Sequence, residues 1–84
     1  MNDHMLDKLN YEIELSVECI AIEKGIKTYK DLKEKEPKAF DAIKALINAY
    51  NKIVEYYYLP EYVKGFKIAP KQKIEEVFNN VKGV

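Results

Sequence analysis

The sequence predicts an all-α fold, a small helical bundle in one domain, and three observations support that prediction. The chain has 84 residues, which is the length of a single domain. Its hydrophobic fraction of 48% can fill a core, and only three glycines and three prolines interrupt regular structure. Apolar residues recur at steps of three and four, as on one face of an α-helix. We expect three main helices, at about 5–24, 38–58 and 70–82, with short helical turns at about 29–35 and 60–64.

The first main helix is predicted from two apolar stripes. One stripe consists of Leu6, Leu9, Ile13, Val17 and Ile20, and the other of Leu15, Cys19, Ile22 and Ile26. Together they indicate one wide apolar face, and Gly25 is placed to end the helix. Because Cys19 lies within an apolar stripe, we expect its thiol to be buried and unreactive.

Capping and turn residues predict where the later helices begin and end. Thr28 is the expected N-cap of the first short helix, with Asp31 at the capping-box position. Pro37 suits the first turn of the next helix. Pro60 ends that helix, because it lacks the backbone N–H and its ring collides with the preceding turn. The remaining signals are Gly65 closing the turn after Pro60, Pro70 starting the last helix and Gly83 stopping it.

The helix at about 38–58 has the most regular apolar pattern. Its steps of three and four define a heptad seam of Phe40, Ile43, Ile47, Tyr50, Val54 and Tyr57, which Leu46 and Ile53 widen. The last helix carries Ile74, Val77, Phe78 and Val81 on one face. Heptad seams also join helices of different chains. We therefore expect a homodimer, which would bury more surface than so short a chain buries alone.

Charge and composition limit the possible functions. Fourteen lysines balance fourteen acidic residues, and arginine is absent from the sequence. Residues 1–23 are acidic and residues 62–84 are mildly basic, so the two ends attract each other within or between molecules. Without arginine, sequence-specific recognition of nucleic acid is disfavoured. The single cysteine, the lack of a signal peptide and the lack of a membrane-length apolar run lead us to expect a cytoplasmic protein.

The sequence does not gather the side chains that catalysis requires, and we expect neither an enzyme nor a cofactor. Its only histidine, His4, precedes Met5 in a pair typical of a cloning scar, so residues 1–4 would be a foreign or disordered leader. Glu14 and Glu18 lie one helical turn apart and could hold a metal with acids from another helix. A solvated helix face is the simpler interpretation of this pair, and no metal is expected.

Residues 55–66, EYYYLPEYVKGF, contain four tyrosines and a phenylalanine. Tyr57 belongs to the seam together with Tyr50, but not all of these rings can point inward from one helix end. Tyr58 and Tyr62 are expected to meet across the bend at Pro60. The others suit a half-exposed interface, because tyrosine combines an apolar ring with a polar tip. The predicted partner-binding residues are Tyr56, Tyr58, Tyr62, Phe66, Lys64 and Lys67.

These observations favour a small non-catalytic module for protein–protein interaction, acting as a regulator, inhibitor or adaptor. Phages and mobile elements encode many proteins of this type. An alternative is a DNA-binding regulator, because AIEKGIKTYKDL, residues 21–32, is similar to the start of a helix-turn-helix. However, Asp31 and Glu34 stand where that motif needs apolar residues. A second candidate for this motif is YVKGFKIAPKQKIEEVF, residues 62–78, in which Lys71 and Lys73 lie near the start of a helix. Its turn is too long for the motif, and Glu75 and Glu76 follow at once. The lysines between Lys24 and Lys38 form either a solvated face or a surface for an acidic partner.

A further alternative comes from LINAYNKIVEYYYLPEYVKGFKIAPKQKIEEV, residues 46–77. This stretch resembles the late helices of bacteriocin-immunity proteins, in its tyrosine-rich helix end followed by a last amphipathic helix. The resemblance covers about a third of the chain and contains no specific motif. It implies a four-helix bundle and an immunity function.

Overall fold

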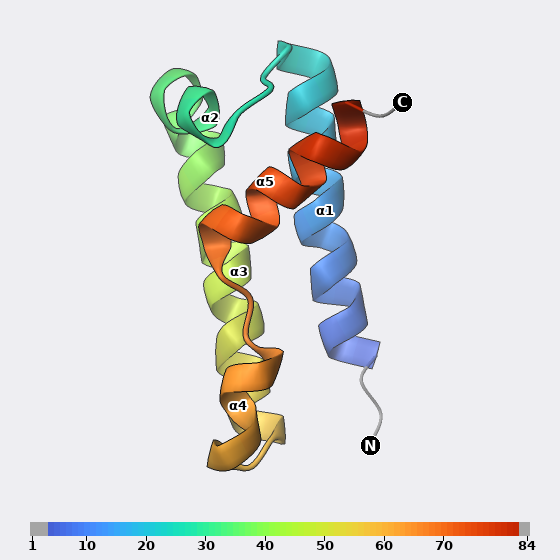
Figure 1. Cartoon of the computed structure of the whole chain (residues 1–84), viewed down its shortest axis with the longest axis vertical. Helices are drawn as coiled ribbons and strands as arrows, with labels where there is room; N and C mark the ends of the chain where they lie inside the picture. The colour runs from blue at the N-terminus through green and yellow to red at the C-terminus, as the bar shows by residue number, and fades with distance from the viewer. Residues whose placement is uncertain (1–3, 83–84) are drawn as a thin grey trace.

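The computed structural model describes residues 4–82 and consists of helices joined by short links (Figure 1). They are α1 (His4–Lys24), α2 (Tyr29–Lys35), α3 (Pro37–Tyr57), α4 (Pro60–Phe66) and α5 (Pro70–Lys82). The long helices α1 and α3 run antiparallel as one layer, and α5 crosses the front of that layer (Figure 1). The short helix α2 lies at one end of the layer, and α4 lies at the other end against α3. The predicted all-α bundle is confirmed.

The local signals in the sequence set most of the helix boundaries. Gly25 ends α1 with a φ of +66°, a left-handed conformation that costs glycine nothing. The backbone N–H of Asp31 donates to the hydroxyl of Thr28 at 3.0 Å, which confirms Thr28 as the N-cap of α2. Pro37 and Pro60 open α3 and α4.

Three predictions about where segments begin or end are corrected by the structure or concern residues outside 4–82. Helix α4 continues through Gly65 to Phe66, so Gly65 lies inside its last turn and does not close it. The extended backbone of Lys67 ends the helix instead. Of the predicted leader, His4 is the first residue of α1, and residues 1–3 lie outside the described residues. The predicted stop at Gly83 also lies outside them.

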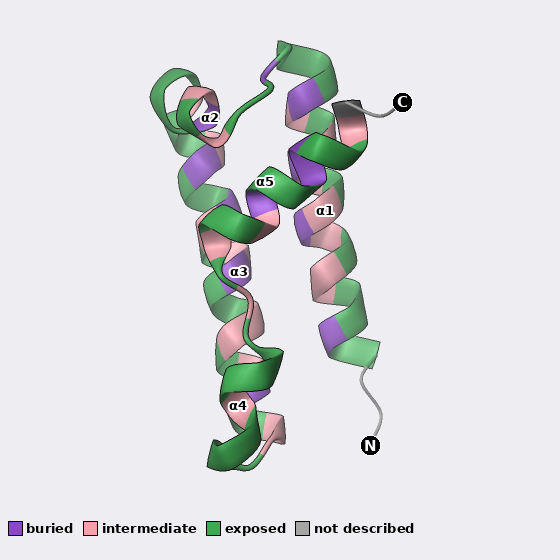
Figure 2. Cartoon of the chain, in the orientation of Figure 1, coloured by how far each residue is buried: buried purple, intermediate pink, exposed green. Residues whose placement is uncertain are grey.

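The core forms where α5 crosses the α1–α3 layer, and Figure 2 shows its buried segments facing one another. Side chains that are at most 2% exposed include Ile13, Val17, Ile43, Ile47, Ile74, Val77 and Phe78. Leu32 of α2 is fully buried and closes one end of the core. The heptad seam of α3 is therefore covered by helices of its own chain.

Most of the second apolar stripe lies outside this core, so the predicted wide apolar face is buried only in part. Leu15 is 38% exposed, Ile22 is 73% exposed and Cys19 is exposed, whereas Ile26 alone of this stripe is buried. The reason is that α3 and α5 cover only one side of α1. The prediction of a buried Cys19 is wrong for the same reason. No helix within residues 4–82 is long and apolar enough to cross a membrane.

Candidate functional site

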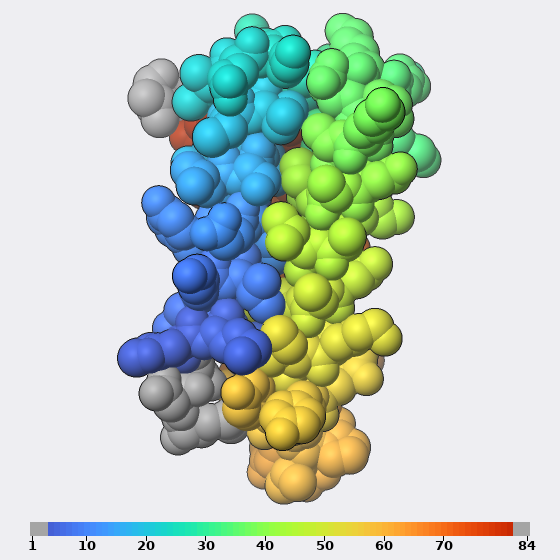
Figure 3. All heavy atoms as spheres, turned by 180° about the vertical axis from the view of Figure 1, so that it is seen from behind, coloured from blue at the N-terminus to red at the C-terminus, as the bar shows by residue number. Residues whose placement is uncertain are grey.

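The predicted partner-binding residues gather at the α4 end of the molecule, which we call the aromatic end. It consists of Tyr56, Tyr57, Tyr58, Leu59, Tyr62 and Phe66, in the yellow and orange segments at the bottom of Figure 3. Helix α4 contains no buried residue. Exposed fractions are 83% for Tyr56, 61% for Leu59, 56% for Tyr62 and 46% for Phe66. This is the largest concentration of exposed apolar side chains within a twelve-residue stretch of the described chain.

Ring contacts order the aromatic end. The rings of Tyr58 and Phe66 stack with centroids 4.2 Å apart and an interplanar angle of 10°. Tyr56 and Tyr57 meet edge to face at 5.2 Å. Tyr58, predicted to meet Tyr62, is thus half-buried against Phe66 at the other end of α4. The stack of Tyr58 on Phe66 fixes the direction of α4. Tyr56 and Tyr62 remain the most exposed rings of the aromatic end.

The two lysines predicted for the site have different surroundings. Lys67 forms an ion pair with Glu55 of α3, with 2.7 Å between its Nζ and the carboxylate Oε2. This hydrogen bond and the lysine charge lower the pKa of Glu55 below its ordinary value of 4.5. Lys64 is exposed on α4. Lys67 therefore helps to position α4, and Lys64 is the lysine that a partner would reach.

A side-chain amide holds the segment that follows α4. Asn51 of α3 accepts a hydrogen bond from the backbone N–H of Ile68 at 2.8 Å. Its Nδ2 donates to the backbone carbonyl of Ile68 at 2.9 Å. The amide thus satisfies both polar groups of one extended residue, as a neighbouring strand would. We call this pair of bonds the Asn51 clamp.

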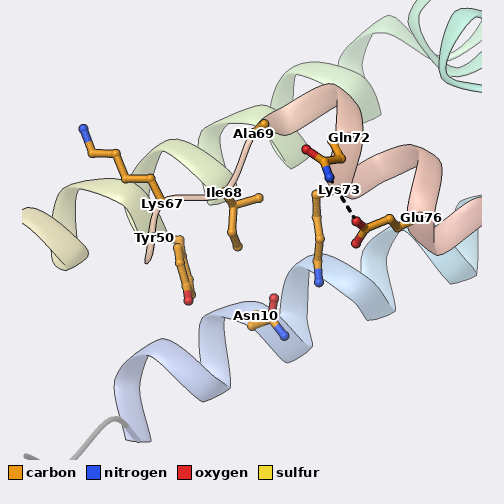
Figure 4. Close-up of a pocket in the computed structure, with 8 residues that line it drawn as sticks. All are labelled: Asn10, Tyr50, Lys67, Ile68, Ala69, Gln72, Lys73 and Glu76. Carbon is orange, nitrogen blue, oxygen red and sulfur yellow. Dashed lines mark hydrogen bonds between the residues drawn. The ribbon is translucent and has the colours of Figure 1, made fainter. Parts of the chain in front are cut away.

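A polar pocket of about 300 Å³ lies between this linker, α1 and α5. Figure 4 shows Asn10, Tyr50 and Lys73 reaching toward it from three different helices. Lys73 is only 14% exposed, and its Nζ lies 2.9 Å from the carboxylate of Glu14. Glu14, considered above as a metal ligand, is thus the partner of Lys73. Among residues 4–82 no three His, Cys, Asp or Glu side chains come together as a metal site.

The basic residues of the DNA-binding alternative have different surroundings. Lys73 is paired with Glu14, and the Nζ of Lys71 lies 5.9 Å from the centre of the Tyr29 ring. The lysines of the Lys24–Lys38 segment are exposed, and Lys35 lies 4.0 Å from Asp31. The lysines of this segment lie in α2 and in the residues next to it, distant in sequence from the aromatic end.

An apolar groove that the sequence did not predict lies on the opposite side of the α1–α3 layer from α5. Its volume is about 330 Å³. It is lined by Leu15, Ser16, Cys19, Ile20, Ala39, Ala42, Ile43 and Leu46. The signal that could have found it is Ala42, a small apolar residue of α3 outside the heptad seam. We call this feature the rear groove.

Comparisons of this chain with protein-family models, with curated proteins and with solved structures gave no match.

Proposed function

We propose that the protein is a non-catalytic interaction module that binds another protein through its aromatic end. The observation that carries this proposal is that α4 buries no residue of its own, while four large apolar side chains around it are exposed. A seven-residue helix is not stable in isolation. Helix α4 is instead held by the Tyr58–Phe66 stack, the Lys67–Glu55 pair and the Asn51 clamp. The chain thus orders a helix that exposes aromatic side chains beside the charged Glu61 and Lys64.

The side chains at this end suit a protein partner. Tyrosine covers a large apolar area, has few torsions to immobilise and offers a hydroxyl for hydrogen bonding. Aromatic residues that become fully covered supply most of the energy in many interfaces. The charges nearby are Glu55, Glu61, Lys64 and Lys67, which balance in sign. We therefore expect a partner surface that is mainly apolar with hydrogen-bond acceptors, and neither strongly acidic nor strongly basic.

The test is quantitative affinity purification from lysate of the source organism, with mass spectrometry and with or without nuclease. The variant is the double substitution Tyr56→Ala with Tyr62→Ala, because these are the two most exposed rings of the aromatic end. Tyr11→Ala is the matched control, since Tyr11 is 59% exposed on α1 and lies outside the aromatic end. Circular dichroism should show the same helix content in all three proteins.

We expect one protein to be captured by the wild type and by Tyr11→Ala and to be lost from the double variant. A ring that is a hot spot of an interface contributes at least about thirtyfold in affinity. Equal capture by the double variant would contradict the aromatic end as the binding surface. Capture that disappears after nuclease treatment would contradict a protein partner and favour the DNA-binding alternative.

A further inference from the structure

Helix α3 has a second apolar face, separate from the seam that it buries against α1 and α5. Ala42, Leu46, Ala49 and Ile53 fall within an arc of about 60° when residues are placed 100° apart around the helix. None of these four side chains is charged, and none is fully buried. Ala42 and Leu46 line the rear groove together with Leu15 and Cys19 of α1, and Ala49 and Ile53 continue the same face of α3 beyond it. Figure 3 views the molecule from this side, with α1 in blue beside α3 in green and yellow.

We infer that this rear face joins two copies of the chain into a two-fold symmetric dimer. The broad side of the molecule measures 39 × 24 Å, which is large enough for the ~800 Å² that each partner of a stable complex usually buries. The chain has a formal net charge of zero, so two copies do not repel each other overall. The inference is independent of the partner proposed for the aromatic end.

Charge complementarity indicates how the two copies are oriented. Between His4 and Lys24, α1 carries five acidic residues and two lysines, whereas α3 carries two acidic residues and three lysines. A pairing of α1 with the α3 of the other copy therefore brings opposite net charges together. A pairing of α1 with the second α1 would bring two acidic helices together.

The positions of individual charged residues along the helix axes agree with this orientation. The two helices run antiparallel, and residues 15–20 share the groove with residues 39–46. Counting equal rises along both helices places Glu23 level with Lys38, and Glu12 within about one turn of Lys52. A two-fold axis parallel to the helices keeps these levels. Glu23 of one copy then lies beside α3 of the other copy, at the height of its Lys38. The aromatic ends of both copies lie at the same end of the dimer.

The first test is the mass in solution, measured by sedimentation equilibrium over a wide concentration range. Ala42→Glu places a charge in the groove, and since Ala42 is exposed in the single chain the variant should still fold. Asn48→Glu is the matched control, with the same new charge on an exposed position of α3 away from the rear face. We expect dimers of the 9.8-kDa chain for the wild type and Asn48→Glu, and monomers for Ala42→Glu.

The thiol of Cys19 identifies the face that is covered, because Cys19 is the single cysteine and lines the groove. Its reaction with a thiol reagent should slow as the concentrations of wild type and Asn48→Glu rise, and should stay fast in Ala42→Glu. A wild type that is monomeric throughout would overturn the inference. So would a dimer in which Cys19 stays fully reactive, because another face would then join the copies. Tyr56→Ala with Tyr62→Ala should leave the dimer intact, which separates this test from that of the partner.

Charge reversal tests the orientation. Glu23→Lys and Lys38→Glu should each weaken the dimer by about tenfold, because the two-fold axis repeats this exposed ion pair and each substitution disrupts both copies of it. The two changes combined in one chain should restore wild-type dimerisation. Equal weakening in the combined variant would show that these residues do not face each other, and would overturn the proposed two-fold axis.

Discussion

Individual side chains, and not a core of its own, hold α4 and the linker after it against α3. Lys67 reaches Glu55 across 2.7 Å, and Tyr58 stacks on Phe66. Both contacts involve residues that remain partly exposed to solvent. Exposed contacts are weaker than buried ones, since water and salt compete with them. The geometry of the aromatic end therefore depends on solution conditions more than the core does.

The Lys67–Glu55 pair should respond to acid in a predictable direction. Its carboxylate has a pKa below 4.5 in the folded chain, because Lys67 donates a hydrogen bond to it and supplies a positive charge. A lowered folded-state pKa stabilises the fold above the unfolded value, and this stabilisation is lost as the pH falls through the folded pKa. Lys67→Gln should return the pKa of Glu55 toward 4.5 in a carboxyl-detected NMR titration. Lys64→Gln, which removes a lysine not paired with Glu55, should leave it unchanged.

Cys19 shows what the periodicity of a helix can and cannot predict. Steps of three and four place Leu15 and Cys19 on one face of α1 and Ile13 and Val17 on another, and both placements are correct. Burial depends on where α3 and α5 pack, and this is information about distant parts of the chain. Ile13 is fully buried while Leu15 is 38% exposed, although both belong to apolar stripes of the same helix. The sequence therefore predicts reliably which residues share one face of a helix. Whether that face is buried follows only from the tertiary structure.

The helices themselves were predictable because their end signals are local. Thr28, Pro37 and Pro60 act through their own backbone and the next turn, so no knowledge of the fold is needed. The residues expected at the candidate site do lie near one another, because they are close in sequence around the Pro60 bend. What the sequence did not indicate is which rings pair. The stack of Tyr58 on Phe66 forms only because α4 extends as far as Phe66.

The Asn51 clamp should determine how firmly the α4–α5 linker is attached to α3. Asn51→Ala removes both hydrogen bonds to Ile68, with an expected loss of about 1–3 kcal/mol in unfolding free energy. Hydrogen exchange should accelerate at the Ile68 amide and through α4, while the centres of α1 and α3 stay protected. Asn48→Ala, on an exposed position one turn earlier, is the control. Unchanged exchange at Ile68 in Asn51→Ala would contradict the clamp.

Across the whole molecule, the chain has more apolar helix surface than one copy covers. Helix α5 covers only the front of the α1–α3 layer, so the core has three helices at its centre and the rear face stays open. A domain of this size buries a small fraction of its surface relative to larger domains, and its stability is correspondingly limited. A second copy on the rear face would complete a bundle of four long helices. Folding and association would then be linked.

Linked folding and association make the melting temperature depend on protein concentration. If the native chain is a dimer, a hundredfold rise in concentration stabilises each chain by about 1.4 kcal/mol. In a domain of this length that corresponds to a rise of about 5–10 °C in Tm. Circular dichroism melts of the wild type and Asn48→Glu should show this rise. Ala42→Glu should melt at one temperature whatever its concentration, because its rear face no longer pairs. A wild-type Tm that stays constant over the same range would mean that the core between α1, α3 and α5 of a single chain accounts for all of its stability.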